Sequence, residues 1–217
     1  MNGSMPIRGR RLYLRPFEAM DFMDVYNNYA SDPEVAKWVS WEPHSSSEET
    51  LSYLMSFVSR YEESDYYHWA IELPTVGVVG AIDVVAKDLA AKEATIGYVL
   101  ARPHWGQGFM SEALSLVLGY LDDEGFLLFK AECLVGNVAS RRVLEKNGFR
   151  LVGEGERTVK GKQEKVYLFE RKKGEAAVSE EGRKGEEHSF TLASNEQEAP
   201  KEEEAFESAY FFPFDGK

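Results

Sequence analysis

The stretch of sequence that decides the fold reads Arg102-Pro103-His104-Trp105-Gly106-Gln107-Gly108-Phe109-Met110-Ser111-Glu112-Ala113-Leu114. It follows a strand-like run that ends near Ala101 and leads directly into a helix-forming segment. Glycines at such a junction let the backbone approach a ligand closely, and the first N–H groups of the helix, at the positive end of its dipole, form an anion site. We therefore predict a pyrophosphate site on the backbone of residues 107–110.

The glycine loop on its own leaves other interpretations open. A Gly-x-Gly turn is often no more than a tight turn, and this one lacks the third glycine of a dinucleotide fingerprint. It also lacks the Gly-Lys-Ser/Thr sequence of a nucleotide P-loop. A phosphate-binding protein without coenzyme A would keep the loop, but it would give no reason for the second motif.

That second motif reads Asn137-Val138-Ala139-Ser140-Arg141-Arg142-Val143-Leu144-Glu145-Lys146-Asn147-Gly148-Phe149. Asn137 suits a helix N-cap and Gly148 suits the C′ position after the helix. A purely structural helix explains those two residues. It has no need of Ser140 one turn from the helix start, or of three cations at positions 141, 142 and 146.

The rest of the chain alternates between strand-like and helix-like patterns. Strands are expected at 11–15, 67–73, 77–85, 94–100, 128–135, 149–154 and 165–170, and helices at 21–29, 47–61, 109–121 and 138–146. This order describes a mixed α/β sheet with helices packed on it. Because hairpin connections join the middle strands, a purely parallel doubly wound fold does not fit.

Length and composition indicate one domain with an appendage. The chain has 217 residues, 43% of them hydrophobic, which is enough for a substantial core. We assign 1–171 to an ordered domain and 172–217 to an acidic, disordered tail with 12 acidic and 6 basic residues. The aromatic end of the tail, 205–214, either docks on a domain or is an unstructured terminus.

Charge and composition exclude several classes of protein. The net charge of −12 argues against nucleic acid as a partner, although half of the excess lies in the tail. No apolar run approaches the roughly 18–20 residues that span a bilayer, and no secretory signal is present. The single cysteine, Cys133, reads as a small buried hydrophobe, and the spacing of the histidines suggests no metal site. We expect a cytoplasmic protein.

The two motifs, about thirty residues apart, closely resemble the GNAT superfamily of N-acetyltransferases. Within it, the chain is similar to the branch of ribosomal-protein N-terminal alanine acetyltransferases. Further likeness comes from Leu12-Tyr13-Leu14-Arg15-Pro16-Phe17, residues 31–35 and Ile96-Gly97-Tyr98. The resemblance covers about residues 8–171 and implies a largely antiparallel sheet, split in a V and flanked by about four helices.

The resemblance also implies an acetyl-CoA site in the split. Pantetheine would pair with the backbone around Val99 and Ala101, the pyrophosphate would lie on the glycine loop, and Asn137 would reach the pantetheine amides. Arg141, Arg142 or Lys146 would meet the outer phosphate. The residues expected to contact the cofactor are Val99, Leu100, Ala101, Trp105, Gly106, Gln107, Gly108, Phe109, Met110, Ser111, Asn137, Ser140 and Arg142.

Three positions depart from the pattern of the family. Leu144 stands where many relatives carry a tyrosine acid, so Ser140 becomes the expected donor on the thiol side, with Tyr98 next. Thr95 stands where relatives of this branch often carry glutamate. Glu93, two residues earlier, is either a base acting through water or a solvated edge charge. Pro103 stands where the signature usually begins with Gln or Arg.

The acceptor is expected to be a primary amine, either of a peptide or protein N-terminus or of a small molecule. Trp41 and His44 are candidates for the acceptor pocket, whereas Trp38 is expected in the core. The amine attacks the thioester directly, without a covalent enzyme intermediate. The alternative is a catalytically weak acyl-CoA-binding regulatory module. We expect a monomer or a homodimer.

Overall fold

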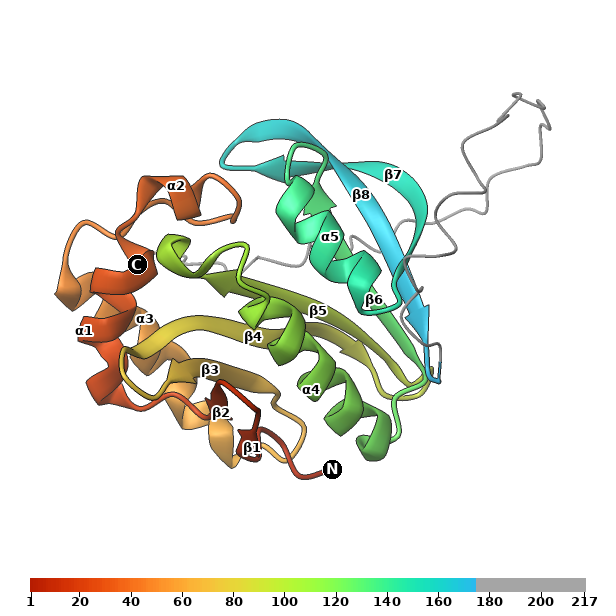
Figure 1. The fold of residues 1–217 in the computed structure, drawn as a ribbon, viewed down its shortest axis with the longest axis horizontal. Helices are drawn as coiled ribbons and strands as arrows, with labels where there is room; N and C mark the ends of the chain where they lie inside the picture. The colour runs from red at the N-terminus through yellow and green to blue at the C-terminus, as the bar shows by residue number, and fades with distance from the viewer. Residues whose placement is uncertain (175–217) are drawn as a thin grey trace.

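The structure, a computed structural model, describes residues 1–174, which form one eight-stranded sheet with the order β1-β2-β3-β4-β5-β6-β8-β7 (Figure 1). The strands are β1 (Ile7–Arg8), β2 (Tyr13–Arg15), β3 (His68–Leu73), β4 (Gly77–Asp88), β5 (Glu93–Leu100), β6 (Leu128–Leu134), β7 (Arg150–Val159) and β8 (Lys162–Lys172). Neighbouring strands are antiparallel except for β5 and β6, which are parallel. The expected mixed, largely antiparallel sheet is confirmed.

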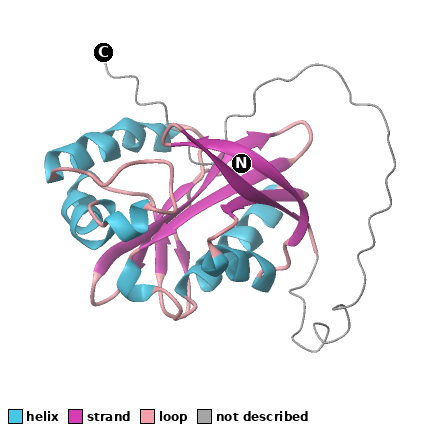
Figure 2. Cartoon of the chain, turned by 90° about the horizontal axis from the view of Figure 1, so that it is seen from above, coloured by secondary structure: helices cyan, strands magenta, loops and turns pink. Residues whose placement is uncertain are grey.

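Helices cover both faces of this sheet (Figure 2). They are α1 (Phe22–Val25), α2 (Pro33–Ala36), α3 (Ser47–Val58), α4 (Phe109–Glu124) and α5 (Val138–Lys146), with the π-helical η2 (Tyr26–Ala30) and the 3₁₀ turns η1 (Ala19–Asp21), η3 (Ser59–Glu62) and η4 (Arg102–His104). The expected helix at 138–146 has the bounds that the sequence predicted.

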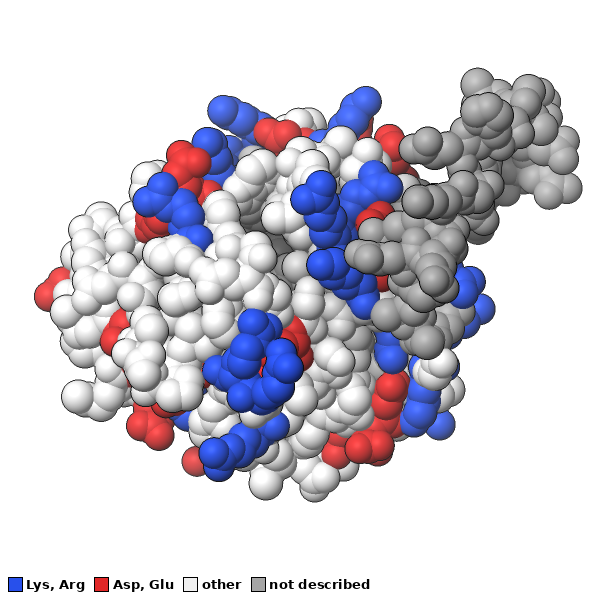
Figure 3. Space-filling view, in the orientation of Figure 1, with Lys and Arg blue, Asp and Glu red and all other residues white. Residues whose placement is uncertain are grey.

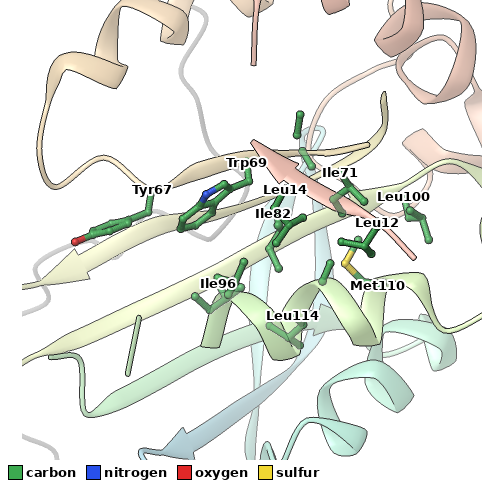
Figure 4. Packing of buried hydrophobic residues seen from close by; sticks show 14 of the residues in the cluster. Leu12, Leu14, Tyr67, Trp69, Ile71, Ile82, Ile96, Leu100, Met110 and Leu114 are labelled. Carbon is green, nitrogen blue, oxygen red and sulfur yellow. The ribbon is translucent and has the colours of Figure 1, made fainter. Parts of the chain in front are cut away.

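Alternation along the strands separates the two faces. Ile82 and Ile96 face α4 and pack with Leu114 in the main core (Figure 4). His68 pairs with Asp83 across β3 and β4, and its ring lies 4.4 Å from Phe57 of α3. Because successive side chains of a strand point to opposite faces, Asp83 shares the α3 face and its neighbour Ile82 the α4 face.

The sheet opens in a V between its two parallel strands. Residues 93–95 of β5 pair with 128–130 of β6, and the pairing ends there. Beyond that point β5 stays bonded to β4, whereas all of β6 pairs with β8. The predicted split between these two strands is therefore present, with its open end at the last residues of β5 and β6.

Some elements differ from the sequence prediction. The expected helix at 21–29 consists of α1 followed by η2, in which Ser31 N–H bonds Tyr26 at 3.3 Å with the longer, π-type spacing. The expected helix at 47–61 is α3, capped by the Ser46 hydroxyl that accepts from the Glu49 N–H, and it ends at Val58, where η3 follows. Strand β8 reaches Lys172, one residue past the expected domain boundary. The tail beyond 174, with its aromatic end, lies outside the described residues.

Candidate active site

The glycine loop begins α4 with two left-handed residues. Gly106 has a φ of 72° and Gly108, the N-cap, a φ of 80°. A Cβ atom at Gly106 would meet no described atom within 4 Å, and one at Gly108 would meet only the Arg11 guanidinium, at 3.4 Å. The backbone N–H groups of Gln107 and Gly108 donate to no described residue. Open space beside free donors at a helix start fits an anionic group such as a pyrophosphate.

Two side chains of the loop hold it on the end of β5. The Trp105 indole N–H donates to the Leu100 carbonyl at 2.7 Å, and the Gln107 side-chain amide donates to the Pro103 carbonyl at 2.7 Å. These bonds leave the backbone N–H groups of Gln107 and Gly108 free for a ligand. They give Trp105 and the Gln107 side chain a supporting role beside their predicted place in the cofactor site.

A third support comes from Arg11, which sequence analysis did not single out. Its Nη1 donates to the Gln107 carbonyl at 2.8 Å, its Nε donates to Glu112 at 2.7 Å, and its guanidinium lies 4.5 Å from the centre of the Phe109 ring. By engaging the Gln107 carbonyl, Arg11 restrains the peptide that carries the Gly108 N–H. It also places a positive charge beside the expected anion site.

We expect Arg11→Ala to weaken the binding of coenzyme A about fivefold, or roughly 1 kcal/mol, because the loop loses its restraint and a nearby cation. Calorimetric titration measures the change. Arg10→Ala is the matched control, since Arg10 bonds Glu112 through its backbone N–H, which the substitution keeps, and its side chain makes no hydrogen bond to a described residue. Equal affinity in a folded Arg11→Ala protein would show that the clamp is dispensable.

The backbone groups of β5 that face the split belong to residues one position away from the predicted ones. The Ala101 N–H donates to the Val79 carbonyl of β4 at 2.7 Å. Because alternate residues of a strand turn their N–H and C=O groups the same way, Val99 also pairs with β4. Tyr98 and Leu100 therefore turn their backbone groups towards the split. We correct the expected pantetheine contacts from Val99 and Ala101 to these two residues.

The first turn of α5 lies across the split from β5. Asn137 caps the helix, its Oδ1 accepting from the Ser140 N–H at 3.0 Å, and its Nδ2 donates to no described residue. The Tyr98 hydroxyl lies 2.9 Å from Ser140 Oγ and donates to the Ser140 carbonyl at 3.3 Å. The structure thus brings together two residues that the sequence predicted separately as thiol-side acids.

Burial sets the protonation of this pair and of its neighbour Cys133. Burial raises the pKa of Tyr98 far above its ordinary value, so the hydroxyl keeps its proton at neutral pH. Burial also raises the pKa of Cys133 to about 11, although a hydrogen bond with Ser140 opposes the shift. A thiol with that pKa is a poor nucleophile, which agrees with its predicted role as a small buried side chain.

The cations of α5 divide into engaged and exposed residues. Arg141 pairs with Glu145 at 2.8 Å and lies over the Tyr167 ring. Arg142 and Lys146 are exposed, and Figure 3 shows Lys and Arg side chains gathered over this helix. The exposed Arg142 stays the predicted contact for the outer phosphate. Leu144 is fully buried, so that position of α5 contributes to the core.

Glu93 lies at the closed end of the split and not at the site. Its carboxylate accepts from Lys130 at 2.6 Å, where β5 and β6 still pair. At about 3.3 Å per residue, six residues of β5 place it roughly 20 Å from Val99. The structure therefore does not bring Glu93 to Tyr98 and Ser140, and its predicted catalytic role is corrected to that of an edge ion pair.

A row of aromatic rings leads from the loop after α2 to the sheet. Trp41 lies 5.5 Å from His44, His44 lies 5.4 Å from Tyr53, and Tyr53 lies 5.2 Å from Phe57, which contacts His68. Burial lowers the pKa of His44, so its ring is neutral at pH 7. Trp41 and His44 thus stand on the α3 face, where the acceptor pocket is predicted.

Trp38 is not in the core as expected. It is half-buried and lines an open cavity of about 460 Å³ at the end of β6. The other residues that line the cavity are Lys37, Leu134, Val135, Gly136, Gln163, Glu164 and Lys165. The turn between β7 and β8 closes over this region, since Lys160 Nζ donates to the Ala36 carbonyl at 2.6 Å. The surroundings of Trp38 thus include residues far away in the sequence, which strand and helix periodicity cannot show.

Asp83 is the acidic residue that sequence analysis missed. It is half-buried in β4 directly after the apolar run Val78-Val79-Gly80-Ala81-Ile82, and burial raises its pKa to about 8. The available signal was a lone carboxylate in an otherwise apolar strand. No group of His, Cys, Asp and Glu that could hold a metal ion occurs among residues 1–174, and no helix in that range is long and apolar enough to cross a membrane.

A sheet split between parallel strands, an anion site at the start of α4 and a hydroxyl pair at the opening define an acyl-coenzyme A transferase. The domain model "Acetyltransferase (GNAT) domain" matches residues 11–150, and the chain belongs to this family. It is accordingly an acetyl-CoA-dependent acetyltransferase that acts on amine acceptors.

Three known proteins illustrate the relationship. The N-acetyltransferase YoaA of Bacillus subtilis, itself uncharacterized, is 32% identical over 145 residues, which cover 66% of this chain and 81% of that protein. The ribosomal-protein-serine acetyltransferase of Escherichia coli is 36% identical over 77 residues, 35% of this chain and 43% of that protein. The microcin C7 self-immunity acetyltransferase MccE, solved with acetyl-CoA and AMP, has a TM-score of 0.69 at 18% identity and covers 75% and 93% of the two chains. The predicted likeness to ribosomal-protein acetyltransferases is confirmed.

Proposed function

We propose that this enzyme transfers the acetyl group to the α-amine of a peptide or protein N-terminus, by direct attack of the amine. The observation that carries the proposal is the Tyr98–Ser140 pair at the open end of the split. The likeness to a ribosomal-protein-serine acetyltransferase supports the acceptor class. A small-molecule amine is the second acceptor class that the same chemistry accommodates.

Acetyl-CoA, when bound, supplies an activated acetyl group. The residues of this chain hold it and manage protons. The loop of residues 106–110 would hold the pyrophosphate. The backbone of Tyr98 and the N–H of Leu100 would offer the edge for pantetheine, since the Leu100 carbonyl already accepts from Trp105. The Tyr98 hydroxyl, bonded to Ser140, holds the proton needed on the sulfur side. Such a positioned acid contributes about 100-fold or more to rate.

A screen of acceptors tests the proposal. Thiol release from acetyl-CoA is measured with peptides that begin with Ala, Ser or Met, with the same peptides blocked at the N-terminus, and with small amines. We expect release with free peptides and none with blocked ones. Preference for small amines would overturn the acceptor class. Tight binding of acetyl-CoA without turnover on any amine would favour the regulatory module that Leu144 and Thr95 left open.

A further inference from the structure

The segment of residues 32–38, which contains α2, is held on both arms of the split. Its first residue, Asp32, caps α2 by accepting from the Glu34 N–H at 2.8 Å, and its carboxylate also lies 3.1 Å from Arg102 Nε. Arg102 follows the end of β5 and begins the turn that leads into the glycine loop. The start of the segment is therefore tied to the β5 arm, beside the expected cofactor site.

The other end of the segment is held on the β6 arm. The Trp38 ring lies against Gly136, where an added Cβ atom would stand 3.6 Å from it, and Gly136 directly precedes the Asn137 cap of α5. Lys160, in the turn between β7 and β8, donates to the Ala36 carbonyl at 2.6 Å, and Figure 1 shows that turn beside α2. A segment fixed to both arms crosses the mouth of the split, and we call it the strap.

The open cavity of about 460 Å³ borders the end of the strap. Lys37 and Trp38 form its wall on the strap side, and the residues at the end of β6 and at the start of β8 form the opposite wall. Its volume is within the range of roughly 300–1,000 Å³ that ligand sites have. Gly136 lines the cavity and precedes the first turn of α5, which carries Ser140. The cavity therefore adjoins the end of the split at which acetyl transfer is expected.

The strap depends on these outside contacts for its conformation. α2 is a single turn of four residues, Pro33–Ala36, and a helix that short is not stable on its own. The Arg102 and Asp32 side chains are 58% and 19% exposed, and an ion pair at the surface contributes little to global stability. Its loss should therefore change the order of the strap, and with it the place of Trp38, more than the stability of the domain.

We propose that Arg102 is a positioning residue for the acceptor and that Trp38 is a residue that determines acceptor specificity. Arg102 holds the strap across the mouth of the split, and the strap sets the wall of the cavity in which the acceptor chain lies behind its amine. The inference rests on the proposed amine acetylation. It gives Arg102, next to the glycine loop in sequence, a role on the acceptor side and not at the cofactor phosphates.

Arg102→Ala removes the tether at the β5 arm. We expect the KM of a peptide acceptor to rise about fivefold, the upper end for one surface ion pair, while the dissociation constant of coenzyme A stays within about twofold. Arg102→Lys, which keeps a cation near Asp32, should restore most of the acceptor affinity. Arg60→Ala is the matched control, since Arg60 forms an exposed ion pair with Glu63 in which the N···O distance is also 3.1 Å.

Trp38→Ala removes the aromatic wall of the cavity and the contact with Gly136. We expect kcat/KM for peptide acceptors to fall at least about tenfold, as for a buried aromatic contact in a binding site, with coenzyme A affinity again within about twofold. Leu89→Ala, at an exposed apolar residue in the turn after β4, is the control.

Hydrogen exchange tests the tether without any substrate. The N–H groups of Ala36, Lys37 and Trp38 are bonded within the strap, so their exchange reports its opening. We expect these amides to exchange at least about threefold faster in Arg102→Ala and at the wild-type rate in Arg60→Ala. Unchanged exchange in Arg102→Ala, or coenzyme A affinity that falls as much as acceptor affinity, overturns the role of Arg102.

The kinetic outcomes separate this inference from the proposed function. A wild type that acetylates peptides, with folded Arg102→Ala and Trp38→Ala proteins that do so equally well, overturns the role of the strap and leaves the acetylation standing. A wild type inactive on every amine overturns the proposed function, and the acceptor role of the strap falls with it, whatever exchange shows of the tether.

Discussion

Tyr98→Phe is expected to lower kcat about 100-fold while the dissociation constant for coenzyme A stays within about twofold. The substitution keeps the ring and removes the hydroxyl that bridges β5 to Ser140. A proton needed only as the thiol departs matters in the transition state and not in binding, so the loss appears in kcat alone. Single-turnover kinetics with a peptide acceptor measures it.

Ser140→Ala should lower kcat by about 10- to 100-fold, and the double variant should lose little more than Tyr98→Phe. Two hydroxyls that share one hydrogen bond act as a unit, so their effects do not add. Tyr13→Phe, at an exposed site on β2, is the control. Wild-type turnover in both single variants, with chemistry rate-limiting, would remove the pair from the mechanism.

Gly108→Val is expected to weaken the binding of coenzyme A at least about tenfold, or roughly 1.4 kcal/mol. Gly108 has a left-handed φ of 80°, which a β-branched residue rarely adopts, and valine would fill space at the helix start. Both effects act on the N–H groups that the pyrophosphate needs.

Gly119→Val is the matched control for that change, because a Cβ atom at this exposed position of α4 meets nothing within 4 Å. Calorimetry gives the affinities and thermal unfolding confirms that both variants fold. A folded Gly108→Val protein with unchanged affinity would place the pyrophosphate elsewhere.

The parts of the site that the sequence could predict depend on local signals. Gly106 and Gly108 stand directly before the first residues of α4. Asn137 and Gly148 mark the two ends of α5 within thirteen residues of sequence. Such signals need no knowledge of tertiary contacts. Ser140 and Tyr98 were also found, but their bond spans 42 residues and shows only once β5 and α5 face each other.

The missed or corrected residues depend on sheet register or on distant packing. Whether the backbone N–H and C=O of Val99 or those of Leu100 face the split depends on which of the two residues bonds β4. The alternation of side chains along a strand does not show this pairing. Asp83 stands out only in the fold, where strand register places it opposite His68 of β3 and Gly97 of β5 and burial raises its pKa. Trp38 lies beside a cavity lined by residues about a hundred or more positions later in the sequence, among them Gly136 and Lys165.

The place of β8 in the sheet has a consequence for how the enzyme is made. It is the last strand of residues 1–174, yet it lies between β6 and β7, and β6 pairs along its whole length with it. During synthesis both cofactor motifs emerge before the strand that holds one arm of the split. A nascent chain that ends at Phe149 therefore carries the motifs without the site. We therefore expect acetyl-CoA to stabilise the fold only once β8 has been made and has joined β6.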